Sequence, residues 1–224
     1  AGSYYENLGL PMDENFDCKK LIQKTSQPTD DTIATIALID STLNPWKYGF
    51  RKNRRPAKAL KTWVRLYPDA DWGTIFKPWG MGNNYSKNYK SGGNGAVMRL
   101  AGLTLIKPKE MEETAKRWTQ CSHNTAESLQ SAELVARFFE SYRDIDHQKL
   151  IRGLLIDWEI LFGEKAPNPR ECIKNRSIFP DAKRTIALSL RILQEAKNFE
   201  EAIVMSIKAN LDTDTQACVT GMLA

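Results

Sequence analysis

The sequence lacks any apolar run long enough to cross a membrane. Nowhere do its 224 residues approach the roughly 18–20 consecutive apolar residues that a membrane-spanning helix needs. No secretory signal precedes the first segment with a folded pattern. We therefore expect a cytoplasmic protein without a membrane partner, unless an upstream segment has been removed.

Cysteine and histidine are scarce, with four and two residues respectively. Cys18, Cys121, Cys172 and Cys218 form no CxxC pair, and none lies at zinc-ligand spacing from a histidine. This argues against a structural zinc site. Free thiols are favoured over disulfides, because a cytosolic compartment keeps thiols reduced.

Alternating β-branched segments are also missing, which argues against a sheet. Apolar residues at three- and four-residue spacing indicate helices instead. No internal repeat or domain boundary is visible, so we predict one all-α domain, a single compact orthogonal bundle over residues 1–224. The predicted helices begin near Asp30 and further cover 111–122, 125–142, 146–163, 181–197 and 198–210.

Positive charge exceeds negative charge by +5, and much of the excess lies in 47–65, "KYGFRKNRRPAKALKTWVR". Tyr48, Phe50 and Trp63 are interleaved with these cations, a pattern that can bind phosphates and stack bases. The alternative is a solvated basic face whose aromatic side chains point into the core. The charge also suits another anionic ligand, such as a pyrophosphate.

The stretch "TDDT" places two carboxylates at the start of a predicted helix. Thr29 is suited to the N-cap, and Asp30 and Asp31 would then occupy the first turn, where the helix dipole favours anions. Capping does not require both carboxylates, however, and Thr32 rules out a capping box completed by glutamate. A metal site is the competing interpretation.

A second pair of aspartates stands near the other end of the chain, in "DTDT". Asp212 and Asp214 again precede a helical pattern, with hydroxyls at Thr213 and Thr215. Four carboxylates brought together repel one another unless cations neutralise them. Carboxylate and hydroxyl ligands suit Mg²⁺ or Mn²⁺. If the two helix starts lie close together, the sequence predicts a two-metal site.

The stretch "SGGNGAVMRLAG", residues 91–102, is rich in glycine. Gly92, Gly93 and Gly95 permit positive φ and a close approach of the backbone to a ligand. A helix starting directly after them would direct its N–H groups at an anion. A simple turn remains the alternative, because the Lys-Ser/Thr of a Walker motif and a preceding strand are absent.

Together these stretches resemble the ADP-ribosylglycohydrolase family. The motifs "TDDT" (29–32), "GNGAVMR" (93–99), "SHNTAES" (122–128) and "DTDT" (212–215) occur in the family's order, after an opening "GSYYEN" similar to its first motif. The resemblance covers nearly the whole chain. It implies an all-α orthogonal bundle around a binuclear Mg²⁺ or Mn²⁺ site, and a hydrolase that releases ADP-ribose from a modified protein or a small conjugate.

The resemblance also implies roles for particular residues. Asp31, Asp212 and Glu6 would supply the catalytic carboxylate. Gly93, Asn94 and Gly95 would approach the diphosphate, with Met98 beside them, His123 against the ADP-ribose and Asp71 as a further substrate contact. The metal ligands would be Thr29, Asp30, Asp31, Asp212, Asp214 and Thr215. Glu6 as a surface acid, His123 as a core or capping residue and Asp71 as a turn residue remain alternatives.

The chain departs from the family pattern in two respects. Asn210 and Leu211 stand where the family usually has two glycines, and their side chains would crowd the ligand or shift the metal ligands. The chain also begins inside the first motif and ends at "GMLA", so we expect either a trimmed molecule or a fragment.

The resemblance leaves the activity and the acceptor open. A non-catalytic ADP-ribose-binding or crystallin-like member is one alternative, and a basic nucleic-acid-binding helical protein is another. We expect a monomer. The acceptor and the choice between Mg²⁺ and Mn²⁺ are not determined by the sequence.

Overall fold

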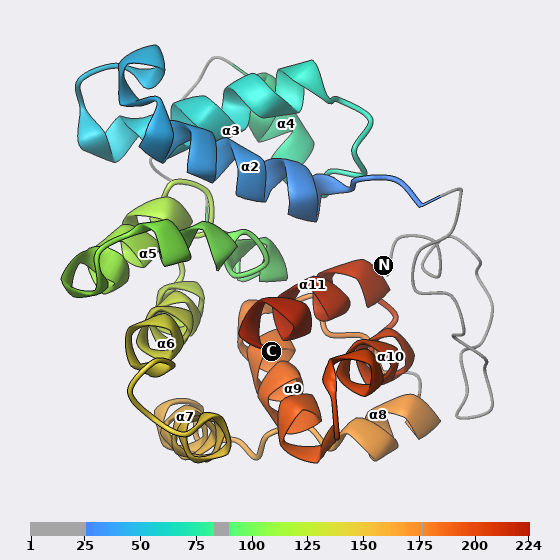
Figure 1. The fold of residues 1–224 in the computed structure, drawn as a ribbon. Coiled ribbons are helices and arrows are strands. Elements are labelled where there is room, and N and C mark those ends of the chain that lie inside the picture. Colours follow the sequence, from blue (N-terminus) through green and yellow to red (C-terminus); the bar gives the residue numbers. More distant parts are fainter. Residues whose placement is uncertain (1–25, 83–89, 176) are drawn as a thin grey trace. The chain divides into compact units, whose positions relative to one another are not determined.

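The computed structural model describes residues 26–82, 90–175 and 177–224, and within them the chain is helical with no β-strand (Figure 1). The prediction of an all-α protein is confirmed. No helix in these ranges combines the length and apolarity needed to span a bilayer.

The chain divides into two compact units. We call Pro28–Ala136 the N-terminal unit, and Arg137–Ala224, with Ser26 and Gln27, the C-terminal unit. The boundary falls inside helix α6 (Ala126–Ser141). Two compact units can form one domain, so the single domain expected from the sequence stays a prediction.

The N-terminal unit contains short α-helices joined by 3₁₀ segments, labelled η. In chain order before α6 they are α2 (Asp30–Leu43), η1 (Pro45–Tyr48), η2 (Lys52–Arg54), α3 (Arg55–Leu66), α4 (Phe76–Met81), η3 (Asn94–Ala96), η4 (Leu100–Leu105), η5 (Pro108–Glu110) and α5 (Met111–Gln120).

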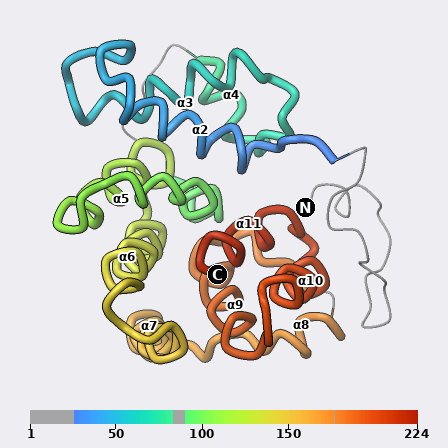
Figure 2. Tube along the Cα trace, viewed as in Figure 1, coloured from blue at the N-terminus to red at the C-terminus, as the bar shows by residue number. Residues whose placement is uncertain are grey.

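Helices α2 and α3 pack side by side in this unit (Figures 1 and 2). The buried face of α2 carries Ala34, Ala37 and Leu38, and that of α3 carries Leu60 and Val64. Their three- and four-residue spacing is that of one helix face, which explains why these stretches fold as amphipathic helices.

The C-terminal unit is centred on α9 (Ala182–Glu195), most of whose side chains are buried. It packs against α7 (His147–Phe162), α8 (Pro169–Asn175), α10 (Phe199–Ala209) and α11 (Thr213–Leu223), as Figure 2 lets the reader follow. A helix that is apolar on several sides is expected at the centre of such a cluster.

The helices predicted from periodicity are found as α2, α5, α6, α7, α9 and α10. Three of the starts in the C-terminal unit carry side-chain caps. Asp146 accepts a hydrogen bond from Lys149 N, Asp181 from Arg184 N, and Asn198 from Glu201 N, each at 2.9 Å.

The crossing of α3 and α4 depends on a glycine. A Cβ built on Gly80 would lie 2.6 Å from Val64 Cγ1, closer than two carbon atoms can pack. We predict that Gly80→Ala lowers the free energy of unfolding by about 1–3 kcal/mol in urea denaturation, through overpacking. Adding Val64→Ala should recover part of this loss.

Gly153→Ala is the matched control, because its Cβ would meet nothing within 4 Å on α7. Helix propensity alone should make that variant more stable, by roughly 0.5–1 kcal/mol. Equal effects of the two glycine substitutions would contradict the packing at Gly80.

Candidate functional site

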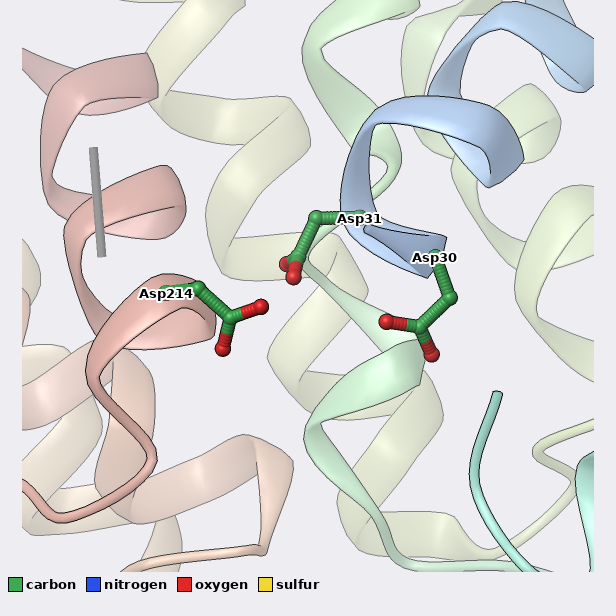
Figure 3. Close-up of side chains that lie close together, drawn as sticks. All are labelled: Asp30, Asp31 and Asp214. Carbon is green, nitrogen blue, oxygen red and sulfur yellow. The ribbon is translucent and has the colours of Figure 1, made fainter. Parts of the chain in front are cut away.

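The start of α2 carries Thr29, Asp30 and Asp31, as predicted. Figure 3 shows both aspartate side chains leaving the first turn of the helix. Thr29 is the N-cap, but its side chain caps no backbone N–H. Its hydroxyl instead donates to Asp31 Oδ2 over 3.2 Å, and both residues are buried. The threonine thus holds a buried carboxylate in place and leaves the N–H groups of the helix to other acceptors.

The start of α11 repeats this arrangement. Asp212 is the N-cap, and its side chain also caps no backbone N–H. Asp214, labelled in Figure 3 on the first turn of α11, accepts a hydrogen bond from Thr215 N at 2.8 Å. Thr213 and Thr215 are buried, whereas the two aspartates are partly exposed.

These two helix starts differ from those of α7, α9 and α10, where the polar side chain at the N-cap does accept a backbone N–H. The capping interpretation of "TDDT" and "DTDT" therefore loses its main support. Each start gathers carboxylate and hydroxyl oxygens, the donor set that hard divalent cations prefer.

The glycine-rich stretch does not form the α-helix expected after it. Asn94–Ala96 and Leu100–Leu105 form the 3₁₀ segments η3 and η4, with a turn at 97–99 between them. Within the loop, Ala96 N donates to Gly93 O, and Val97 N and Met98 N donate to Asn94 O. These N–H groups are therefore engaged within the loop.

The glycines serve close approach and not positive φ, which corrects the other part of that expectation. Gly93 has φ −63°, and the positive-φ glycines within the described ranges are Gly49 and Gly163. A Cβ built on Gly95 would lie 3.0 Å from His123 Cε1 and Nε2. A side chain at position 95 would thus press on the imidazole, which is why the loop needs glycine there.

The segment 122–128, "SHNTAES", packs against the glycine-rich loop and is hydrogen-bonded to it. Ser128 Oγ donates to Ser91 O at 2.9 Å, and Thr125 Oγ1 donates to Ser128 Oγ at the same distance. These hydrogen bonds anchor the loop at Ser91, and the imidazole of His123 lies against Gly95. The 122–128 motif therefore positions the glycine loop, a role that its pattern alone did not indicate.

The family resemblance places Arg99, with Met98, at the start of the segment that follows the glycines, and the structure adds its contacts with the 122–128 motif. It is fully buried, and its Nη2 donates to Ser122 Oγ at 2.7 Å and to Trp118 O at 3.2 Å. Its guanidinium also lies over the Phe76 ring, 5.8 Å from the ring centroid. An arginine between the apolar residues Met98 and Leu100 was the available signal for its burial.

His123 is held neutral. Burial, and secondarily the Arg99 guanidinium, lower its pKa well below the ordinary value of 6.5. Nδ1 lies 3.4 Å from Arg99 Nη2 and 3.0 Å from Ser122 Oγ. Because a guanidinium only donates, Nδ1 must accept, and this assigns the ring proton to Nε2, the nitrogen beside Gly95.

Other predicted residues have more limited support. Asp71 is exposed with φ 54°, in the left-handed region that aspartate tolerates in turns, so the turn interpretation accounts for its conformation. Met98 is buried, close to Gly95. Glu6 and Cys18 lie outside the described residues, while Cys121, Cys172 and Cys218 are free thiols.

Several side chains of the basic segment 47–65 make contacts within the protein. Tyr48 OH and Trp63 Nε1 donate to Asp40, and Lys47 forms an ion pair with the same carboxylate at 2.7 Å. Burial raises the pKa of Asp40, but these hydrogen bonds outweigh it and hold the pKa well below its usual range. Phe50 alone among the three aromatic residues is fully exposed, at 98%.

Comparison with solved structures shows which fold the chain shares. The chain shares its fold with a solved structure described as an ADP-ribosylglycohydrolase-related protein complex, with a TM-score of 0.68 and 24% identity. The match covers 100% of this chain and 82% of the other. At that identity the likeness concerns the fold.

The family follows from the sequence model. The ADP-ribosylglycohydrolase model matches residues 2–224, and the chain belongs to this family. Family membership places it among the glycohydrolases of ADP-ribosylated substrates. No curated protein sequence matched the chain.

The buried His123 predicts a pH-dependent stability. Its folded pKa lies below 6.5, so the unfolded chain binds a proton that the folded chain does not. Stability is therefore fully present above about pH 6.5 and falls below it, by up to about 1.4 kcal/mol per pH unit. Urea denaturation at about pH 7.5 and 5.5 should show this loss, and His123→Gln should reduce it.

His147→Gln is the control, since it removes the chain's other histidine. The loss of stability between the two pH values should be smaller in His123→Gln than in this variant, and the titration of surface carboxylates is common to all three proteins. An unchanged slope in His123→Gln would contradict a neutral, buried His123.

Proposed function

We propose that this protein is a Mg²⁺- or Mn²⁺-dependent ADP-ribosyl hydrolase, which cleaves the N- or O-glycosidic bond between ribose C1 and a protein acceptor or small conjugate. The observation that carries the proposal is that two helix starts each present aspartates beside a threonine, with an N-cap side chain that caps no backbone N–H. Membership of the glycohydrolase family supplies the reaction class.

Six residues would hold the cations, and their chemistry fits two hard ions: the hydroxyls and carboxylates of Thr29, Asp30, Asp31, Asp212, Asp214 and Thr215. Such ions, when bound, orient vicinal hydroxyls and lower the pKa of a water molecule. Burial of Asp31 supports this assignment, because burying an ionised carboxylate costs free energy that a nearby cation offsets.

The glycine loop would bind the diphosphate. The backbone of Gly93, Asn94 and Gly95 would face the diphosphate, while the imidazole of His123 fills the space where a side chain at position 95 would lie. His123 packs against this stretch, and its Nε2 proton lies beside Gly95. Being neutral, it would orient the loop without adding charge to the site.

In the reaction a water molecule attacks ribose C1 while the bond from C1 to the acceptor nitrogen or oxygen breaks. The electron pair of that bond leaves with the acceptor, which takes up a proton. A carboxylate accepts the proton of the attacking water, and Asp31, Asp212 and Glu6 are the candidates for this base.

We predict that Asp30→Asn and Asp212→Asn each lower the rate of ADP-ribose release by more than about 100-fold, since each removes a charged ligand. Both variants should also lose the rise in melting temperature that Mg²⁺ or Mn²⁺ gives the wild-type protein. A metal-supplemented release assay across acceptors modified on arginine, serine and other groups measures the first effect.

Asp146→Asn is the matched control, because asparagine caps a helix as well as aspartate does and Asp146 caps α7. That variant should retain full activity. Full turnover by either test variant in Mg²⁺ would contradict the site. Calorimetric binding of ADP-ribose by the wild type, with no release from any acceptor, would favour the non-catalytic alternative.

A further inference from the structure

Asn210 is a buried amide in the turn that leads into α11. It is 1% exposed. Its Oδ1 accepts hydrogen bonds from Phe179 N at 3.0 Å and from Asp212 N at 3.2 Å. Its Nδ2 donates to Gln216 Oε1 at 3.1 Å and to Phe179 O at 3.4 Å. All four hydrogen-bonding positions of the amide are therefore used.

These partners determine which way the amide points. Phe179 offers both a backbone donor and a backbone acceptor, so the oxygen of Asn210 must face the N–H and its nitrogen the carbonyl. The bond from Asp212 N to Oδ1 closes an Asx-turn over 210–212. The turn that ends at Asp212 is thus shaped by the side chain two residues before it.

Gln216 extends the contact from the turn into the core. Its Nε2 donates to Ser189 Oγ at 2.7 Å and to Thr185 O at 3.1 Å, both on α9. Thr220 also bonds Ser189 at 3.0 Å and receives a hydrogen bond from Ser206 of α10 at 2.8 Å. A fully satisfied buried network of this kind fixes the arrangement of the helices that it joins.

A backbone hydrogen bond also holds the turn over 210–212. Leu211 N donates to Ser177 O at 3.0 Å, while the Leu211 side chain is 45% exposed. Asn210 points into the core of the C-terminal unit. The structure therefore gives Asn210 a structural role that the expectation of crowding did not include.

We propose that Asn210 is a positioning residue for the aspartates at the start of α11. Its amide fixes the backbone from which Asp212 and Asp214 project, and Gln216 ties that backbone to α9. This inference rests on the proposed function, because it assigns Asn210 an effect on cation binding by those aspartates. Asn210 itself contacts neither substrate nor cation in this account.

The test is Mn²⁺ binding by the full chain, measured by electron paramagnetic resonance titration. Asn210→Ala should weaken Mn²⁺ binding by about 10-fold or more, the usual scale for loss of a group that orients metal ligands. Asn210→Ser keeps an acceptor within reach of Asp212 N–H and should weaken binding less. The serine variant also provides a measurement if Asn210→Ala does not fold.

Ser206→Ala is the matched control. It removes a buried hydrogen bond of the same network at the α10 end, away from the turn. It should lower the melting temperature by a few degrees, as the Asn210 variants do, but leave the Mn²⁺ affinity within about twofold of wild type. Stability and positioning are thereby measured separately.

The outcomes distinguish this inference from the proposed function. If the wild type binds Mn²⁺ and both Asn210 variants bind it equally well, the inference is wrong and the proposed function stands. If Ser206→Ala weakens binding as much as Asn210→Ala, the effect is one of general stability and the inference is also wrong. If the wild type binds no Mn²⁺, both fail.

Discussion

Buried polar groups must be hydrogen-bonded, and this constraint shapes the segments that carry the candidate site. In the N-terminal unit, the buried guanidinium of Arg99 bonds Ser122 and Trp118 and lies against His123, which supports the glycine loop. In the C-terminal unit, the buried amides of Asn210 and Gln216 bond to each other and fix the start of α11. Each network is internal to its unit, and each ends at a segment that carries motif residues.

Helix starts are suitable places for such motif residues. The first turn favours negative charge through the helix dipole, and a fixed backbone limits the positions that the carboxylates can reach. The starts of α7, α9 and α10 use their polar side chains as caps, whereas those of α2 and α11 do not. The polar side chain at the helix start therefore caps the helix in three places, and in the other two the helix start carries carboxylates that we propose as cation ligands.

The sequence predicted the helical segments well because apolar spacing reports burial directly. It also placed the paired aspartates correctly, at the starts of α2 and α11. The 3₁₀ segments after Gly93 were not predicted, because Ala, Val, Met and Leu suit an α-helix equally well. The residue types also do not determine which N–H groups bond to Gly93 O and Asn94 O. The apolar neighbours Met98 and Leu100 indicate that Arg99 is buried, but no pattern around Asn210 indicates its burial. Periodicity identifies apolar faces, but it does not show which polar side chain finds partners inside.

We propose that the aspartates of "TDDT" and "DTDT" share cations. Crystals of the full chain soaked in Mn²⁺, with diffraction data collected at the manganese edge, test this most directly. We expect anomalous peaks bonded to carboxylate oxygens from both motifs, with Asp30 or Asp31 on one side and Asp212 or Asp214 on the other. Peaks confined to one motif, or absent from both while Mn²⁺ binds elsewhere, would contradict it.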